Sequence, residues 1–586
     1  MRKKDTSDAS RPDGRRSSTE TLHLRAATRA LRLHLDELPV DFHFWGPGDQ
    51  FLAECAFPFA RQRYDCAESM IGAGFGGTVL GSLARSLFDD GLRWLWIGDD
   101  PTNRRVALLG SMLEERNRVC MTLESNDASC PILPRWFAPL VGVTDLTGAS
   151  ETWLRAPAVP DQATLLDAFL SEGRPIDAAQ DEVLDAARGL LDIAGLRGAV
   201  MVLSHAGHGN LLGTQSSFTE GGGIGHDLRP DHEALYMQVA AVGVTLTLIG
   251  VSRAVPESWP NEVPQHSFLD KTLRLTTEVV HAATVIHGLR TPKVPRTVAR
   301  RRSSRPRPTP LLRPAALLSP DDYLPDVNSA DEVIDAAKRY YEAARSWIAD
   351  PWHEDQPANM ASILTYGGAH SALQAVMSTY DQPGSAVIAV FAARMLLEEA
   401  ARFKWMIEGR TEDEIRLRFK QFFEDQRVRR KKVLDELSGD GVARAKAERL
   451  LALPSNVTVI TPHDNISKGR KPMPSIEKML AVMGEPYPEP GWLNVAYSLL
   501  SQVTHSTPIG HLHMASFQRG ILHANEISAE MLGLTLDSAC LGSALLIGIS
   551  ASFLSGGSQE ARDHSLSLHQ LAYDVHNQAR LVHGLD

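Results

Sequence analysis

The sequence predicts an all-α protein of two tandem, related helical-bundle domains joined by a basic linker rich in Pro and Arg. Amphipathic helical patterns run almost without interruption from about residue 20 to 288, and again from about 327 to the end. Strand signals are few. The best of them, VTVITP at 457–462, is too isolated to form a sheet. A helical motif also recurs in the two halves.

The recurring motif is R-x3-[DE]-[DE]-x2-R-x2-W. It occurs as LARSLFDDGLRWLW at 83–96 and as AARMLLEEAARFKW at 392–405. A second pair, LSHAGHGNLLG at 203–213 and LSQVTHSTPIG at 500–510, has Ser and His four positions apart and ends in Gly. The copies in each pair lie about 300 residues apart, which indicates one helical unit present twice.

Composition is that of a soluble globular protein, with 43% hydrophobic and 22% charged residues in 586. The net charge is −11, although the stretch 290–313 holds nine Lys or Arg and no acid. The remaining chain is therefore acidic, which argues against a broad nucleic-acid-binding surface on it. Five cysteines without C-x2-C spacing and a polar N-terminus without an apolar signal segment predict a cytoplasmic protein.

These patterns divide the chain into a disordered tail at 1–19, an N-terminal helical domain at 20–289, a linker at 290–326 and a C-terminal helical domain at 327–586. Dense prolines and like charges predict an extended linker, which we expect to contact either nucleic acid or the acidic domains. The uncharged stretch Ala234–Ser252 is long enough to span a membrane. We interpret it as a buried bundle helix, because its counterpart Met531–Leu554 carries Asp537.

The shared helix carries a polar stripe. In the second half, Arg394, Glu398, Arg402 and Trp405 fall within an arc of about 80° on an otherwise apolar helix. One interpretation is structural, because an Arg–acid–Arg ladder can satisfy its own charges and fix how helices dock. The other is functional, with one arginine facing a cleft to bind an anion such as phosphate. The first half has the same stripe at Arg85, Asp89, Arg93 and Trp96.

The second motif places Ser501 and His505 one helical turn apart. A histidine in the last turn of a helix lies at the negative end of the macrodipole, and a serine one turn earlier can orient its imidazole. A buried interhelical hydrogen bond and general acid/base catalysis are the two interpretations. Neither motif supplies an acid for a Ser–His–Asp triad, and no G-x-S-x-G occurs, so serine-hydrolase chemistry is disfavoured.

No metal or cofactor is expected. The spacing of His505, His511 and His513 fits no zinc pattern, and the latter two align with Thr214 and Ser216 in the first half. IGAGFGG at 71–77 satisfies G-x-G-x-x-G, but polar, helical residues precede it in place of a buried strand. We interpret these glycines as a turn between helices.

RMLLEEAARFKW, followed about a hundred residues later by AYSLLSQVTHSTP, resembles an uncharacterised bacterial helical family that pairs R-x4-E-x2-R-x2-W with Y-x3-S-x3-H-x2-P. The resemblance covers residues 330–555, and the same pattern recurs less completely in residues 50–255. More distantly, the layout resembles the HEPN superfamily. Those helical bundles act as dimers, often as metal-independent ribonucleases in toxin–antitoxin and phage-defence systems, with an R-x4-6-H motif and a neighbouring acid.

This resemblance implies roles for residues of both motifs. His505 would be the acid/base, Arg394 or Arg402 would bind the scissile phosphate, and Glu399 or Glu398 would orient one of them. The spacing of the second motif adds Ser501 as the residue that would orient the imidazole. The chain departs from the pattern because no arginine lies four to six positions before His505. The first half has Val200 and Leu211 where the second has Tyr497 and Pro508, so we interpret it as a degenerate copy in an internal pseudo-dimer.

Two hypotheses of function follow. The first is a non-catalytic helical module that binds a partner protein or a small anion, with structural stripes. The alternative is a HEPN-like, metal-independent ribonuclease or nucleotide-handling effector in stress or phage defence. We expect a protein or RNA partner and no membrane association, with a homo-oligomer as one of the assemblies that the chain can form. An enzyme should have its stripe and histidine lining an open cleft, whereas a scaffold should have them buried and mutually bonded.

Overall fold

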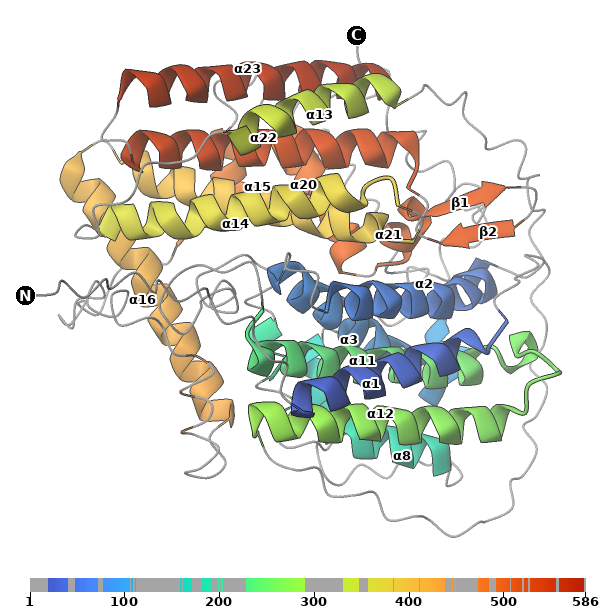
Figure 1. Ribbon diagram of the computed structural model, residues 1–586. Helices are drawn as coiled ribbons and strands as arrows, with labels where there is room; N and C mark the ends of the chain where they lie inside the picture. The colour runs from blue at the N-terminus through green and yellow to red at the C-terminus, as the bar shows by residue number, and fades with distance from the viewer. Residues whose placement is uncertain are drawn as a thin grey trace, which may run out of the picture.

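Long helices account for most of the residues that the computed structural model describes, together with a short β-hairpin (Figure 1). All-α is therefore the fold class. The structure describes residues 19–39, 48–71, 77–105, 107–108, 159–160, 162–170, 182–191, 228–289, 330–346, 357–382, 384–409, 411–437, 473–483, 492–505, 507–518, 521–524, 527–554 and 558–583, with a few shorter pieces between them.

The first half forms the lower layers in Figure 1 and the second half the upper layers. The described helices of the first half are α1 (Thr19–Asp36), α2 (Gly48–Met70), α3 (Gly77–Asp99), α7 (Gln162–Leu170), α8 (Glu182–Leu191), α11 (Pro230–Ala254), the 3₁₀ turn η2 (Pro256–Ser258) and α12 (Gln265–His287).

The described part of the second half consists of further long helices and a β-hairpin. Its elements are α13 (Asp331–Ser346), α14 (Pro357–Thr379), α15 (Ala386–Ile407), α16 (Glu412–Leu437), α19 (Ile476–Met483), α20 (Trp492–Thr504), α21 (Pro508–His513), β1 (Ala515–Gln518), β2 (Ile521–Ala524), α22 (Ala529–Leu554) and α23 (Gln559–Val582). Strands β1 and β2 pair antiparallel. The sequence did not predict this hairpin.

The same packing pairs occur in both halves. In the first, α1 packs on α12, α2 and α3 pack on α11, and α11 packs on α12. In the second, α13 packs on α23, α14 and α15 pack on α22, and α22 packs on α23. The two copies of the shared motif occupy the same place in this scheme, since 83–96 lies in α3 and 392–405 in α15.

Helices α11 and α22 form the centre of each half. Both are long and apolar enough to cross a membrane by length and composition, and their most apolar windows are 100% and 94% buried inside the protein. The stretch Ala234–Ser252 thus lies in a buried bundle helix, as we predicted from Asp537 in its counterpart Met531–Leu554. Apolar residues on every side are what a helix surrounded by other helices requires.

Glycines allow α3 and α11 to approach each other closely. A Cβ atom on Gly91 would lie 2.5 Å from the carbonyl oxygen of Gly243, and one on Gly243 would lie 2.5 Å from the carbonyl carbon of Leu87. The second half has a related contact, because a Cβ on Gly542 in α22 would lie 2.9 Å from the carbonyl carbon of Leu396 in α15. Leu87 and Leu396 hold matching positions in the repeated motif.

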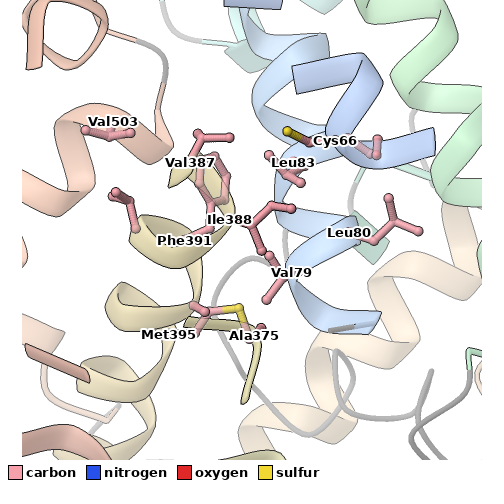
Figure 2. Close-up of a cluster of buried hydrophobic side chains, with 14 of the residues drawn as sticks. Cys66, Val79, Leu80, Leu83, Ala375, Val387, Ile388, Phe391, Met395 and Val503 are labelled. Atoms are coloured by element: carbon pink, nitrogen blue, oxygen red, sulfur yellow. The ribbon is translucent and has the colours of Figure 1, made fainter. Parts of the chain in front are cut away.

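The two halves also pack against each other through α3 and α15, the helices that carry the motif. Figure 2 shows the apolar contact: Val79 and Leu83 from α3 face Val387, Ile388, Phe391 and Met395 from α15. Buried apolar residues of both halves therefore belong to one continuous core. Burial of such side chains contributes about 1.5–3 kcal/mol each, so this contact holds the halves together.

Several sequence predictions fall on residues outside the described part of the chain. These include the tail before Thr19, the linker, and the strand candidate at 457–462. The glycine-rich loop is bracketed by described helices, since α2 ends at Met70 and α3 begins at Gly77. A helix, not a strand, precedes those glycines, which is incompatible with a dinucleotide-binding βαβ unit. The domain boundaries stay predictions.

Candidate functional site

The stripe on α15 is a closed ionic ladder. Nη2 of Arg394 lies 2.7 Å from Oε1 of Glu398, and Nη2 of Arg402 lies 3.0 Å from Oε2 of the same carboxylate. The Glu398 side chain is 0% exposed, and those of Arg394 and Arg402 are 4% and 10% exposed. Spacing of four residues brings each charge one helical turn from the next, so the helix itself sets this geometry.

Helix α20 docks onto this ladder through two side chains. The Tyr497 hydroxyl donates a hydrogen bond of 2.9 Å to Oε1 of Glu398, and Nε of Arg394 donates one of 3.1 Å to the Ser501 hydroxyl. The Arg394 guanidinium also lies over the Tyr497 ring, 5.3 Å from its centroid. Tyr497 and Ser501 are one turn apart and therefore present both hydroxyls on one face of α20.

These contacts keep Arg394 charged and Tyr497 neutral although both side chains are buried. Burial disfavours a charged guanidinium, yet the carboxylate of Glu398 and the hydroxyl of Tyr497 raise the pKa of Arg394 above its usual value. Burial, with Glu398 adding to it, raises the pKa of Tyr497 to about 12. The tyrosine therefore stays a neutral hydrogen-bond donor to Glu398 at any physiological pH.

Glu399 follows the ladder acid and has a different environment. It is partly buried, and burial raises its pKa to about 8, with Arg402 opposing the shift and Glu398 adding to it. Its carboxyl group therefore holds a proton at neutral pH. A neutral carboxylic acid can donate or transfer that proton, which is the chemistry that a general acid needs.

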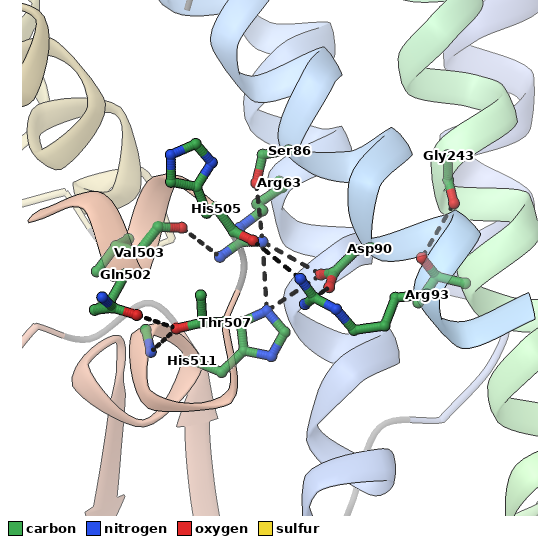
Figure 3. Close-up of polar contacts among 12 residues, drawn as sticks. Arg63, Ser86, Asp90, Arg93, Gly243, Gln502, Val503, His505, Thr507 and His511 are labelled. Carbon is green, nitrogen blue, oxygen red and sulfur yellow. Dashed lines mark hydrogen bonds and ion pairs between the residues drawn. The ribbon is translucent and has the colours of Figure 1, made fainter. Parts of the chain in front are cut away.

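His505 lies just beyond the C-terminus of α20, which ends at Thr504. Its backbone N–H donates to the Ser501 carbonyl at 2.9 Å, and its own carbonyl accepts from Nη2 of Arg93 at 3.5 Å. Figure 3 shows the imidazole turned away from the carboxylate of Asp90. The structure thus brings Arg394, Arg402 and Ser501 together around Glu398, and places His505 at the boundary between the halves.

In the first half the motif contributes to a different group of charged side chains, which we call the Asp90 cluster (Figure 3). It consists of Asp90, Arg63, Arg93 and His511. Arg85 pairs with Asp89 at 3.3 Å, but the fully buried carboxylate is the next one, Asp90. Nη1 of Arg63 in α2 lies 3.4 Å from Oδ2 of Asp90, and Nη1 of Arg93 lies 3.3 Å from Oδ1.

The Asp90 cluster reaches across to the second half. Nε2 of His511 in α21 lies 3.2 Å from Oδ2 of Asp90, and Nη2 of Arg63 donates to the Val503 carbonyl at 3.3 Å. Burial opposes ionisation of Asp90, but His511, Arg93 and Arg63 hold its pKa below the usual value. Burial lowers the pKa of His511, against the opposing effect of Asp90. The cluster therefore joins α2 and α3 to α20 and α21.

The tryptophans that end the motif are held in the same way in both halves. Arg104 donates to the Trp96 carbonyl at 2.6 Å and lies 4.7 Å from the centre of its ring. Arg418 donates to the Trp405 carbonyl at 2.6 Å and lies 5.3 Å from its ring. An arginine on the last carbonyls of a helix satisfies acceptors that lack an intrahelical partner.

Sequence reasoning missed the partners that come from other helices. Tyr497 was recognised only as part of a spacing pattern, although its position one turn before Ser501 was a usable signal. Arg63 has no motif around it, and its distance along the chain from His511 left no local signal. Arg104 and Arg418 follow their tryptophans at different spacings, eight and thirteen residues, so no shared pattern connected them.

Within the described ranges, no group of three or more His, Cys, Asp or Glu side chains is arranged to hold a metal ion. Comparison with models of known protein families, with curated protein sequences and with solved structures finds no match. The chemistry of this chain must therefore be inferred from its own residues.

Proposed function

We propose that this chain is a non-catalytic helical module that binds a partner protein or a small anion, and that its polar stripes hold its helices together. The observation that carries this proposal is the state of Glu398. Its side chain is 0% exposed, and Arg394, Arg402 and Tyr497 occupy its two oxygens. A mutually bonded and buried stripe is what a scaffold requires.

Energetics support the same assignment. To reach Arg394, a phosphate would have to enter a place where the guanidinium already bonds Glu398, Tyr497 and Ser501. Removing one partner of a buried ion pair costs about 3–5 kcal/mol, because the remaining charge stays desolvated. An anion that displaced Glu398 would incur this cost in every binding event. The Asp90 cluster is buried in the same way.

A second candidate function rests on two residues outside the ladder. Glu399 holds a proton at neutral pH beside Arg402, and His505 is partly exposed. Glu399 and Arg402 lie within α15, and His505 lies just beyond the C-terminus of α20, toward the other end of α15. An acid, an arginine and a histidine are the types of group that metal-independent RNA cleavage uses. This observation favours a HEPN-like ribonuclease or nucleotide-handling effector as the alternative.

RNA cleavage separates the two. Purified wild-type protein and a His505→Ala variant are incubated with total RNA and with tRNA in the presence of a chelator. His281→Ala is the matched control, because His281 is an exposed histidine on α12. A scaffold leaves the RNA intact in all three samples. Metal-independent cleavage by wild-type and by His281→Ala, but not by His505→Ala, would overturn the proposal and establish the ribonuclease.

A further inference from the structure

We infer that the carboxylate of Glu399 binds a small organic cation of the guanidinium class between α14 and α15. Three observations carry this inference. Glu399 has no bonded partner among the described residues, α14 leaves room beside it, and an arginine occupies the matching position in the first half. Such a site goes beyond the proposed function, and it does not depend on what the ladder at Glu398 does.

Glu399 is a partly buried acid of α15 without a bonded counter-charge. Among the residues that the structure describes, none makes a hydrogen bond or an ion pair with its carboxyl group. The nearby Arg402 bonds the other acid, Glu398, at 3.0 Å. Burial raises the pKa of Glu399 to about 8, with Arg402 opposing the shift and Glu398 adding to it. An incoming cation could therefore pair with this carboxylate without displacing a protein partner.

Helix α14, which packs on α15, leaves room beside this carboxyl group. A Cβ atom on Gly368 would lie 3.5 Å from Oε2 of Glu399, and outside its own helix no other atom of the described residues would lie within 4 Å of it. A Cβ on Gly91 in α3, in contrast, would lie 2.5 Å from a backbone oxygen of α11. Gly368 and Glu399 are both partly exposed, so solvent reaches both residues. Helix α14 contains no Lys, Arg, Asp or Glu and supplies no counter-charge.

The first half contains a pair of helices in the same register. Helix α14 begins and ends 309 residues after α2 (357 against 48 and 379 against 70), and α15 begins 309 residues after α3 (386 against 77). The residues that match at this offset are Glu399 and Asp90, Ala372 and Arg63, and Gly368 and Phe59. Each helix pair therefore places an acid opposite two positions that lie one helical turn apart on the neighbouring helix.

Large side chains occupy those two positions in the first half. Nη1 of Arg63 lies 3.4 Å from Oδ2 of Asp90, and Phe59 stacks on His511 with 4.9 Å between the ring centroids. The second half keeps the acid but has an alanine and a glycine there. Beyond Cβ, Ala372 differs from an arginine by one ethylguanidinium group. A guanidinium suits the site, because its planar set of donors can bind both oxygens of a carboxylate.

The test measures binding of ethylguanidinium to the full chain by ligand-observed NMR, with neutral ethylurea as a second probe of similar shape. The first variant, Glu399→Gln, removes the charge and keeps the shape of the side chain. Its matched control is Glu342→Gln on α13, where Glu342 is 65% exposed. The second variant, Ala372→Arg, supplies the guanidinium from within the chain. Its matched control is Ala26→Arg at an exposed position of α1.

We expect wild-type to bind ethylguanidinium at roughly millimolar concentration and ethylurea at least about tenfold more weakly. Glu399→Gln should weaken binding of ethylguanidinium by about tenfold or more, Ala372→Arg should abolish it, and both controls should stay within about twofold of wild-type. The cation pairs with the ionised acid, so its affinity for wild-type should rise by about tenfold from pH 7 to pH 9 and stay constant in Glu399→Gln.

Several results would overturn the inference. These are absence of saturable binding by wild-type, equal binding of ethylurea, and wild-type affinity in Glu399→Gln or in folded Ala372→Arg. If Ala372→Arg does not fold, Glu399→Gln decides, because Gln has nearly the shape of Glu. RNA cleavage that is lost in His505→Ala would overturn the proposed function and leave this binding result unchanged, so the two failures are distinguishable.

Discussion

The carboxylate of Asp90 in α3 lies 3.2 Å from Nε2 of His511 in α21, so a fully buried acid of the first half pairs with a histidine of the second. The same carboxylate also holds Arg63 and Arg93. The two occurrences of the motif therefore differ in which acid is fully buried. In α15 the first acid of the pair organises its own half, whereas in α3 the second acid ties the halves together.

Replacing Asp90 should therefore destabilise the whole molecule. In Asp90→Asn, Arg63 stays buried without a counter-charge, which should lower the free energy of unfolding by about 3–5 kcal/mol. Urea unfolding followed by circular dichroism measures this change. Asp185→Asn is the control, because Asp185 pairs with Arg188 at the surface and its side chain is 50% exposed. A loss below about 1 kcal/mol in Asp90→Asn would contradict the assignment.

The close contact of α3 with α11 should not tolerate a methyl group. A Cβ on Gly243 meets backbone atoms of Leu87 and Phe88 at 2.5–2.6 Å, so Gly243→Ala should cost about 1–3 kcal/mol or more by forcing the helices apart. Gly533→Ala in α22 is the control, since its nearest neighbours are side-chain atoms at 3.7 Å or more. Thermal unfolding should show a lower Tm for the first variant and an unchanged or higher Tm for the second.

Acid should destabilise the protein through buried neutral histidines. Burial lowers the pKa of His583 to about 4 and that of His513 to about 3, from an ordinary value of 6.5. Between pH 6.5 and about 4 the unfolded chain takes up protons that the folded chain does not, so stability falls as the pH falls.

His583→Gln should weaken this dependence on pH. The fall in unfolding free energy from pH 7 to pH 4 should shrink by about 2–3 kcal/mol, whatever the variant costs at neutral pH. Denaturant titrations at both pH values give the difference. His281→Gln, a change at an exposed position, should leave it unaltered. An identical fall in His583→Gln and wild-type would show that His583 titrates normally.

Glu399 should have the opposite dependence. Its pKa of about 8 in the folded protein lies above the ordinary 4.5, so folded protein keeps a proton that the unfolded chain loses. This costs nothing below pH 4.5 and grows as the pH rises to about 8. Glu399→Gln should therefore raise stability by about 1–3 kcal/mol at pH 8 and very little at pH 4. Equal effects at both pH values, measured by urea unfolding, would exclude a raised pKa.

The sequence predicted what is local in this structure. Helical periodicity gave the all-α class, and residues four apart gave the Arg394–Glu398–Arg402 ladder, because a helix fixes which side chains share a face. The sequence could not indicate that Asp90 meets His511, since that contact depends on how two distant helices pack. It also missed the hairpin at 515–524, whose two four-residue strands leave little periodicity to detect.

The most direct test of the structural role of the ladder is the unfolding free energy of Glu398→Gln. Loss of the shared carboxylate leaves two buried arginines without a counter-charge, so we expect a decrease of about 3–5 kcal/mol. Glu342→Gln, at a surface pair in which Glu342 is 65% exposed, should change it by less than about 0.5 kcal/mol. Wild-type stability in Glu398→Gln would contradict a structural ladder and direct attention to anion binding at Arg394.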